Sequence, residues 1–301
     1  MEQESKFKIG YFADGPWSHK TFQLLIDDNR ISIEFIVPRL DTKDYTLRSY
    51  ANKYNIDYLE YVHVNSESFF NKAKSYNCDL FISMSFNQIF KKKIIELPMF
   101  KTINCHAGNL PFYRGRNVLN WVLINDEPEF GITVHFIDES IDTGDIILQR
   151  KFPISDHDDY NSLLEVAYEE CAKILYDSVK LIITNTFKVI SQNEIDPNGS
   201  YCRMRKMGDE IIDWNQSSRK IFNFCRALSK PGPVATTFLN NKEIKISKVR
   251  EVQKTNNIRN CESGMVIKKI KDNFIVKTLD SCVELIEYNT ELKLKVGDKL
   301  E

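Results

Sequence analysis

The feature that most constrains the fold is an alternation, within the first 85 residues, of short β-branched or aromatic runs and segments with helical spacing. The runs predict strands at residues 6–13, 31–37, 59–64 and 79–84, and the segments between them predict helices at 18–29, 45–54 and 69–76. Repeated strand–helix–strand units build parallel sheets that helices cover. We therefore expect an α/β fold with a Rossmann-like open parallel sheet and helices on both faces.

The same alternation continues to residue 183, where the pattern changes. Further strands are expected at 102–106, 132–137 and 145–150, with helices at 118–125 and 162–183. Beyond a helix at 221–228, short runs between turn residues predict five strands, at 234–239, 242–249, 265–270, 274–278 and 283–288. Five short strands predict a small OB-like β-barrel. The expected organisation is an N-terminal domain at 1–190, an irregular linker at 191–210 and a C-terminal barrel domain at 211–301.

Composition limits where the chain acts. Residues 1–15 are too polar for a signal peptide, and no run reaches the roughly 18 apolar residues of a membrane span. The seven cysteines show neither a CxxC pair nor a His-linked metal spacing. These observations predict a cytoplasmic protein with reduced thiols, no membrane association and no metal.

Charge is unevenly distributed along the chain. Residues 203–301 hold 20 Lys and Arg against 13 Asp and Glu, whereas the rest of the chain holds 21 against 29. A basic C-terminal part is typical of a nucleic-acid or anionic-ligand surface, although a solvated face gives the same count. Both interpretations stay open at this point.

Polar residues with catalytic potential gather around one predicted strand and one later loop. Asn104 and His106 are two residues apart on a strand, so their side chains share one face of the sheet. Asp142 lies in the loop that follows the next strand. An amide, an imidazole and a carboxylate suit acyl transfer to an amine, because they can hold an oxyanion, take a proton and orient the ring. One His and one Asp on loops are, however, more often structural.

The order of motifs in this region resembles one known family. Asn104-x-His106 is followed by Leu110-Pro-x-Tyr-Arg-Gly115, Gly131-Ile-Thr133 and Asp142-Thr-Gly144, as in the 10-formyltetrahydrofolate-dependent formyltransferases. The resemblance implies 10-formyltetrahydrofolate as cosubstrate, His106 as general base, Asn104 as stabiliser of the oxyanion and Asp142 as the group that orients His106. It implies no metal, and it extends to the C-terminal barrel.

The resemblance also implies binding residues. The pterin ring of the cosubstrate is expected against two loops, which here contain Phe86 and Ile89, and Asp138, Ser140 and Ile141. Contacts to the acceptor substrate are expected from residues on and after the catalytic loop and from one first-loop aromatic side chain: Trp17, Asn109, Arg114, Arg116 and Asn117.

Two acceptors compete within the family, a nucleotide-linked amino sugar and methionyl-tRNA. The segment Asn117–Asn125 and His135 resemble the sugar enzymes, and residues 38–44 lack the long basic insertion of the tRNA enzymes. We therefore expect a dTDP- or UDP-linked amino-dideoxy sugar, used for a surface polysaccharide such as lipopolysaccharide O-antigen, and we expect nucleic acid to be an unlikely partner. Methionyl-tRNA is the alternative, favoured by the basic C-terminal part. A non-catalytic module that binds folate or a nucleotide sugar is a third. The barrel would dimerise the protein, cap the cleft or stabilise the chain.

Overall fold

The computed structural model describes residues 5–252 and 261–301, so the first four residues of the predicted polar N-terminus lie outside it. The chain forms two compact units that interleave along the sequence. The first unit contains the residues up to Gly115 together with Phe130–Phe152 and Glu165–Tyr201. The second unit contains Arg116–Glu129, Pro153–Leu164 and the residues from Cys202 onward. The sequence analysis expected contiguous domains and placed residues 116–129 and 153–164 in the N-terminal domain, whereas here they belong to the second unit.

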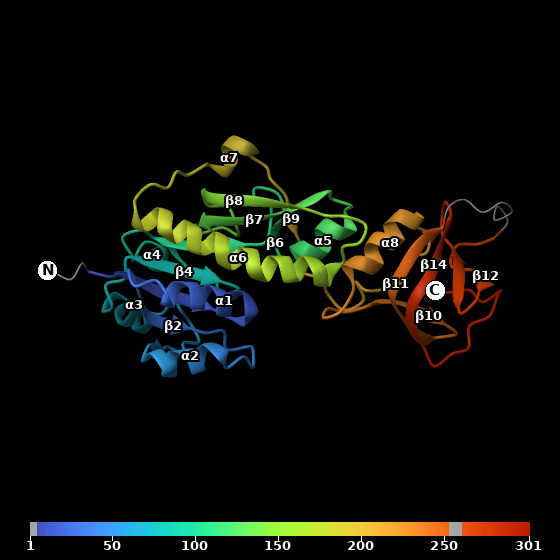
Figure 1. The fold of residues 1–301 in the computed structure, drawn as a ribbon, viewed down its shortest axis with the longest axis horizontal. Coiled ribbons are helices and arrows are strands. Elements are labelled where there is room, and N and C mark those ends of the chain that lie inside the picture. Colours follow the sequence, from blue (N-terminus) through green and yellow to red (C-terminus); the bar gives the residue numbers. More distant parts are fainter. Residues whose placement is uncertain (1–4, 253–260) are drawn as a thin grey trace. The chain divides into compact units, whose positions relative to one another are not determined.

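The first unit is built on a seven-stranded sheet with the order β3-β2-β1-β4-β5-β7-β8 (Figure 1). Its strands are β1 (Phe7–Ala13), β2 (Ile31–Val37), β3 (Asp57–Tyr58), β4 (Leu80–Met84), β5 (Thr102–His106), β7 (Glu129–Phe136) and β8 (Ile146–Pro153). The associated helices are α1 (Gly15–Ile26), α2 (Thr46–Tyr54), α3 (Glu67–Lys74), α4 (Lys92–Ile95), α6 (Tyr160–Ile183) and α7 (Gln192–Ile195). The predicted Rossmann-like α/β fold is therefore confirmed.

The sheet is mixed rather than wholly parallel. Strands β1 to β5 pair in parallel, but β7 runs antiparallel to β5, with Asn104 opposite His135 and His106 opposite Thr133. The expected strand at 59–64 is also wrong, because only Asp57 and Tyr58 pair with β2. Leu59 and Tyr61 instead pack against the aromatic core of this unit as irregular chain.

That core surrounds Phe12 on β1. Its ring meets Phe35 and Phe90 edge-on, with centroids 5.7 and 5.0 Å apart, and Phe69 and Phe81 pack beside it. Four of these five rings are completely buried, and Phe90 is nearly so. Burial of such side chains stabilises the fold by roughly 1.5–3 kcal/mol each relative to exposure. This aromatic cluster joins β1, β2 and β4 to α3 and to the loop after β4.

The second unit contains a five-stranded antiparallel sheet with the order β10-β11-β14-β13-β12. Its elements are α5 (Val118–Ile124), α8 (Ser218–Ala227), β10 (Ala235–Leu239), β11 (Lys242–Val252), β12 (Val266–Ile270), β13 (Asn273–Lys277) and β14 (Cys282–Asn289). Trp214 lies in its core and donates a 2.8 Å hydrogen bond from Nε1 to Thr237. This sheet is consistent with the small barrel-like domain predicted from the sequence. The short strands β6 (Arg114–Gly115) and β9 (Tyr201–Cys202) form a further two-stranded sheet.

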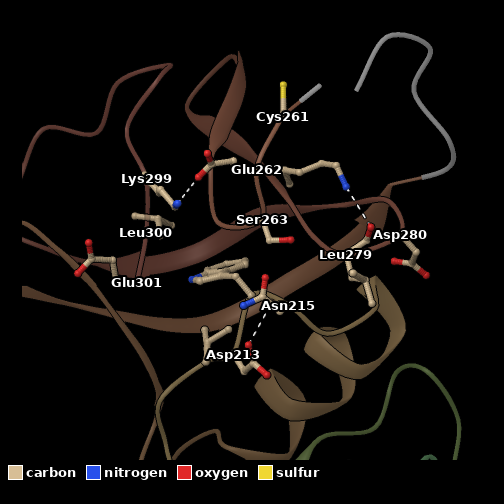
Figure 2. A pocket seen from close by; sticks show the side chains of 13 residues that line it. Asp213, Asn215, Cys261, Glu262, Ser263, Leu279, Asp280, Lys299, Leu300 and Glu301 are labelled. Carbon is tan, nitrogen blue, oxygen red and sulfur yellow. Dashed lines mark hydrogen bonds and ion pairs between the residues drawn. The ribbon is translucent and has the colours of Figure 1, made fainter. Parts of the chain in front are cut away.

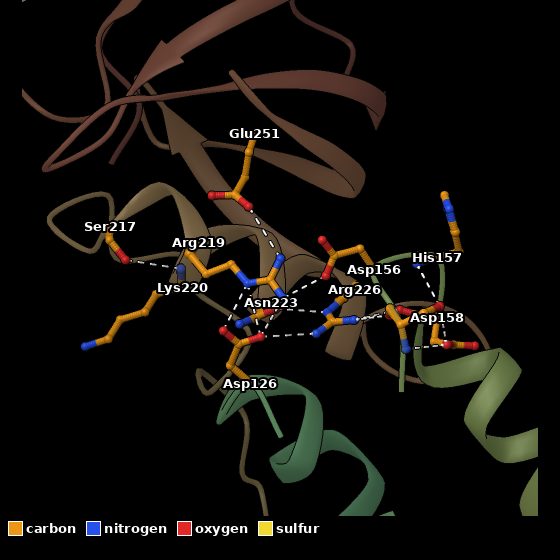
Figure 3. Close-up of polar contacts among 11 residues, drawn as sticks. Asp126, Asp156, His157, Asp158, Ser217, Arg219, Lys220, Asn223, Arg226 and Glu251 are labelled. Carbon is orange, nitrogen blue, oxygen red and sulfur yellow. Dashed lines mark hydrogen bonds and ion pairs between the residues drawn. The ribbon is translucent and has the colours of Figure 1, made fainter. Parts of the chain in front are cut away.

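An ion-pair cluster ties the three segments of the second unit together (Figure 3). Arg219 on α8 contacts Asp126 at 2.6 Å and Asp156 at 2.7 Å, and these two carboxylates come from the separate segments 116–129 and 153–164. Arg226, one to two helical turns further along α8, donates to the carbonyl oxygen of Ser155 at 2.7 Å. Hydrogen bonds with the two aspartates raise the pKa of Arg219 above its usual range, so the cluster stays charged.

Candidate active site

Two neighbouring strands of the first unit carry three polar side chains on one face. Asn104 and His106 are two residues apart on β5, so their side chains lie on the same face of the sheet. His135 on β7 lies directly opposite Asn104. Residues that face each other across an antiparallel pair point to the same side of the sheet. Asn104 Nδ2 lies 3.3 Å from His135 Nε2, and both imidazoles are more than nine-tenths buried. The structure therefore adds a second histidine that the sequence analysis linked only to acceptor choice.

Asp142 reaches this face from the loop after β7. Its Oδ2 lies 3.6 Å from His106 Nδ1, its Oδ1 lies 3.5 Å from His135 Nε2, and Oδ2 accepts a 2.9 Å hydrogen bond from the Gly115 N–H. The loop returns closely over β7 because residue 144 is glycine: a Cβ there would come within 1.9 Å of the Phe136 carbonyl oxygen. The structure thus brings Asn104, His106 and Asp142 together.

The ring of His106 is held mainly by the backbone. Its Nε2 lies 2.7 Å from the Tyr113 carbonyl oxygen, which can only accept, so Nε2 carries a hydrogen. In the neutral ring Nδ1 is then the basic nitrogen, and it faces Asp142. The 3.6 Å separation exceeds an ordinary hydrogen bond, so Asp142 stabilises a protonated ring by charge more than it fixes a neutral one.

The carboxyl group of Asp142 stays ionised. Burial opposes its charge, but the neighbouring His106 and His135 and the Gly115 N–H outweigh burial and hold the pKa of Asp142 well below its usual range. A carboxylate between two imidazoles can stabilise a proton on either ring. The arrangement offers a base, an amide donor and a fixed negative charge, which acyl transfer to an amine requires.

Gln192 supports the loop that carries Asp142. It belongs to residues 191–210, which the sequence analysis expected to be an irregular linker. Its Nε2 donates to the carbonyl oxygens of Asp142 and Gly144 at 2.9 and 2.7 Å. Its Oε1 accepts from Arg114 Nε and Nη2 at 3.0 and 2.8 Å. Arg114 is only 4 % exposed. In this structure the Arg114 guanidinium is thus held by Gln192, and its expected contact with the acceptor stays a prediction.

The residues expected to hold the pterin lie on two loops. β4 and β5 are parallel neighbours, and β5 ends at His106. The loop with Phe86 and Ile89 follows β4 and therefore begins at the same end of the sheet as His106. Phe86 packs on Phe12 and is half-buried, whereas Ile89 is 64 % exposed. In the second loop Asp138, Ser140 and Ile141 are exposed. The Asp138 carboxylate accepts from the Ser140 N–H and the Thr143 hydroxyl, so it shapes the turn itself.

The other residues expected to bind the acceptor belong to both units of the chain. The Trp17 ring packs edge-on against Tyr168 at 4.6 Å, which is a packing contact within the first unit. Asn109 belongs to the same unit, beside Gly131. Arg116 and Asn117 belong to the second unit and are exposed. The Asn117 side chain accepts a 2.9 Å hydrogen bond from the Arg205 N–H.

The second unit contains a pocket of about 700 Å³ (Figure 2). Its walls combine Lys277 and Lys299 with Asp213, Glu262 and Asp280. Mixed charge favours no single class of ligand, and no residue predicted to be functional lines this pocket. Within residues 5–252 and 261–301 there is no group of three metal-ligating side chains, and no helix is long and apolar enough to cross a membrane.

Two family models match the chain. Residues 39–179 match the formyl transferase model, and residues 205–297 match that of the formyl transferase C-terminal domain. The chain belongs to the formyltransferase family. The site of this formyltransferase lies in its N-terminal matched region, which contains Asn104, His106, His135 and Asp142.

Several curated relatives are methionyl-tRNA formyltransferases. The enzyme of Thermodesulfovibrio yellowstonii is 32% identical over 76% of this chain and 71% of its own length. That of Mycoplasma mycoides subsp. mycoides is 28% identical over 96% of this chain and 92% of its own. Among solved structures, the N-formyltransferase of Helicobacter canadensis in complex with folinic acid and dTDP-3-aminofucose shares the fold, with a TM-score of 0.70 and 21% identity over 94% of this chain and 100% of its own.

These comparisons correct the predicted acceptor. The expectation of a nucleotide sugar as acceptor and of nucleic acid as an unlikely partner is wrong, because the curated relatives named above are tRNA enzymes and the likeness to the sugar enzyme is one of fold. The residues behind that expectation serve other purposes in this formyltransferase. Most of α5 after Asn117 is buried, and Asn120 donates to the Ala227 carbonyl oxygen at 2.7 Å. His135 contacts Asn104 and Asp142.

Proposed function

We propose that this formyltransferase moves the formyl group of 10-formyltetrahydrofolate to the amino group of methionyl-tRNA. The observation that carries the acceptor is the similarity to methionyl-tRNA formyltransferases, which in one case extends over 96% of the chain. The meeting of Asn104, His106 and Asp142 on one face of the sheet supports the reaction.

In this proposal the amine attacks the formyl carbon as a neutral nucleophile. Nδ1 of His106 takes the proton that the attacking nitrogen loses, because Nε2 is already bonded to the Tyr113 carbonyl oxygen. The carboxylate of Asp142, 3.6 Å away, stabilises the imidazolium that results. General base catalysis of this kind contributes about 10²–10⁴ in rate.

Asn104 is the proposed donor to the formyl oxygen. Negative charge develops on this oxygen when the carbonyl becomes tetrahedral, and a fixed amide N–H stabilises it. The collapse of the tetrahedral species returns the carbonyl and breaks the bond to N10. The proton that His106 took from the amine passes to N10, so that tetrahydrofolate leaves and the imidazole is neutral again. One such donor contributes about 10²–10³ in rate.

The loops with Phe86 and Ile89, and with Asp138, Ser140 and Ile141, are the proposed pterin site. The exposed Ile89 and the half-buried Phe86 supply the apolar surface that a flat heterocycle requires. The backbone of the 138–141 turn, shaped by the Asp138 carboxylate, offers polar groups for its edge. Two solved structures with this fold are complexes with folinic acid and with tetrahydrofolic acid, which agrees with a folate as the formyl donor.

The C-terminal domain at 211–301 is the proposed tRNA-binding part, with residues 1–190 as the transfer domain. Exposed lysines line β11 and β12, among them Lys245, Lys248, Lys268 and Lys269. Arg116 is an exposed cation directly after the catalytic loop and is proposed to contact phosphate. Affinity that depends on neutralised phosphates falls steeply with salt.

The proposal is tested by offering several acceptors to the purified protein with 10-formyltetrahydrofolate. The panel contains methionyl-tRNA, uncharged tRNA and dTDP- and UDP-linked amino sugars, and tetrahydrofolate release is followed. Release with methionyl-tRNA alone is expected. Release with an amino sugar alone, or with none of the acceptors, contradicts the proposal.

A further inference from the structure

We propose that His135 positions the side-chain amide of Asn104, so that one amide N–H is directed at the formyl oxygen. This inference rests on the formyl transfer proposed above. It adds a positioning residue to the catalytic set of Asn104, His106 and Asp142.

The protonation state of His135 follows from its surroundings. The ring is only 2 % exposed, and its Nδ1 lies 2.8 Å from the Phe136 carbonyl oxygen. Because a carbonyl oxygen can only accept, Nδ1 carries the hydrogen. Nε2 of the neutral ring is therefore an acceptor. The groups beside it are Asn104 Nδ2, at 3.3 Å, and Asp142 Oδ1, at 3.5 Å, and of these two only the amide carries a hydrogen.

Because Nε2 of His135 is an acceptor, it determines which end of the Asn104 side-chain amide points toward His135. The two ends of an amide have almost the same size, so packing alone distinguishes them poorly. Nε2 of His135 accepts from NH₂ and repels the amide oxygen. One N–H of Asn104 is thus used by His135, and the second N–H is left for the formyl oxygen. Rotation of the amide would instead present an oxygen to a developing oxyanion.

Asp142 is the other polar group beside Nε2 of His135, with Oδ1 at 3.5 Å, and His106 lies on the other side of the same carboxylate. A hydrogen on Nε2 would be donated to Asp142, and His135 could then no longer accept from Asn104. The proposal therefore requires the Nδ1–H tautomer of His135.

Two substitutions of His135 distinguish the effect of losing the hydrogen-bond acceptor from the effect of losing the volume of the ring. His135→Leu keeps an apolar volume but offers no acceptor, whereas His135→Gln offers an amide oxygen. In His135→Leu we expect kcat for methionyl-tRNA formylation to fall about 10²-fold with KM within about threefold, because the lost interaction acts in the transition state. In His135→Gln, activity should recover to within about tenfold of wild type. The exposed His63→Leu is the matched control and should match wild type. Equal kcat in the Leu and Gln variants overturns the proposal.

A spectroscopic test needs no substrate and observes the wild-type ring directly. In wild-type protein labelled with ¹⁵N-histidine, His135 should show the Nδ1–H tautomer at neutral pH, assigned by the absence of its signals in His135→Gln. The Nε2–H tautomer overturns the inference. If wild type forms no formylmethionyl-tRNA, the proposed function fails instead, and the tautomer still decides whether His135 accepts from Asn104.

Discussion

Gly108 lies against the imidazole of His106, and a Cβ at position 108 would come within 2.4 Å of His106 Nε2 and 2.5 Å of the Tyr113 carbonyl oxygen. These two atoms form the hydrogen bond that orients the ring of His106, the proposed base. Gly108→Ala should therefore displace the ring and lower kcat by about 10²-fold, within the range for loss of a positioned base. Steady-state kinetics check this expectation, with thermal unfolding to show that the variant is folded. A folded Gly108→Ala enzyme with wild-type kcat would show that the ring is not held in this way.

Asp142→Asn removes the negative charge between His106 and His135 while preserving the shape of the side chain. The imidazolium formed during transfer then loses its stabilising partner, so kcat should fall by about 10²–10⁴-fold. Asp145→Asn, an exposed residue of the same loop, is the matched control and should retain activity. Comparable losses in both variants would mean that loop structure, and not this charge, explains the effect.

Gln192→Leu should destabilise the protein and slow catalysis together. It leaves Nε and Nη2 of the buried Arg114 guanidinium without their acceptor and releases the carbonyl groups of Asp142 and Gly144. Hydrogen bonds to charged groups contribute about 1.5–3 kcal/mol each, so a loss of about 2–3 kcal/mol in the free energy of unfolding is expected. Chemical denaturation measures this loss, with the exposed Asn193→Leu on the same helix as control. Unchanged stability in Gln192→Leu would contradict the structural role of Arg114.

The Arg219 cluster predicts a pH dependence of stability. Hydrogen bonds from Arg219 lower the pKa of Asp126 and of Asp156. A carboxyl group with a lowered pKa in the folded state stabilises the fold above its unfolded pKa, near 4, and this contribution is lost as the pH falls further. Arg219→Gln should therefore lower the melting temperature at pH 7 and have a smaller effect near pH 2. Both carboxylates are largely exposed, so the change should be small. An effect that grows on acidification would contradict this assignment.

The sequence was most informative where hydrophobic patterning alone specifies structure. The β-branched run at 31–37 and the long amphipathic segment at 162–183 became β2 and α6 with little change of bounds. Patterning could not give the direction of β7, because an antiparallel strand buried on both faces shows the same run of apolar residues. The structural role of His135 depends on this register.

The supporting residues of the site were harder to predict. Gln192 lies in a polar stretch without periodicity, and only the folded chain brings it to Asp142, 50 positions earlier in the sequence. Arg114 stands in a motif with exposed polar neighbours, so its burial was not apparent. The acceptor was misjudged because the segment Asn117–Asn125 was interpreted as a resemblance to the sugar enzymes, whereas most residues of α5 are buried and pack within the second unit.

The most direct test of the central claim is the rate of formylmethionyl-tRNA formation from 10-formyltetrahydrofolate by wild type and His106→Asn. Single-turnover conditions should give formylmethionyl-tRNA with wild type and a rate lower by about 10²–10⁴-fold with the variant. Binding of methionyl-tRNA should change by no more than a few-fold, because the substitution removes the base and not the tRNA-binding surface. Absence of formylmethionyl-tRNA with wild type, or a His106→Asn rate near that of wild type, would contradict the account.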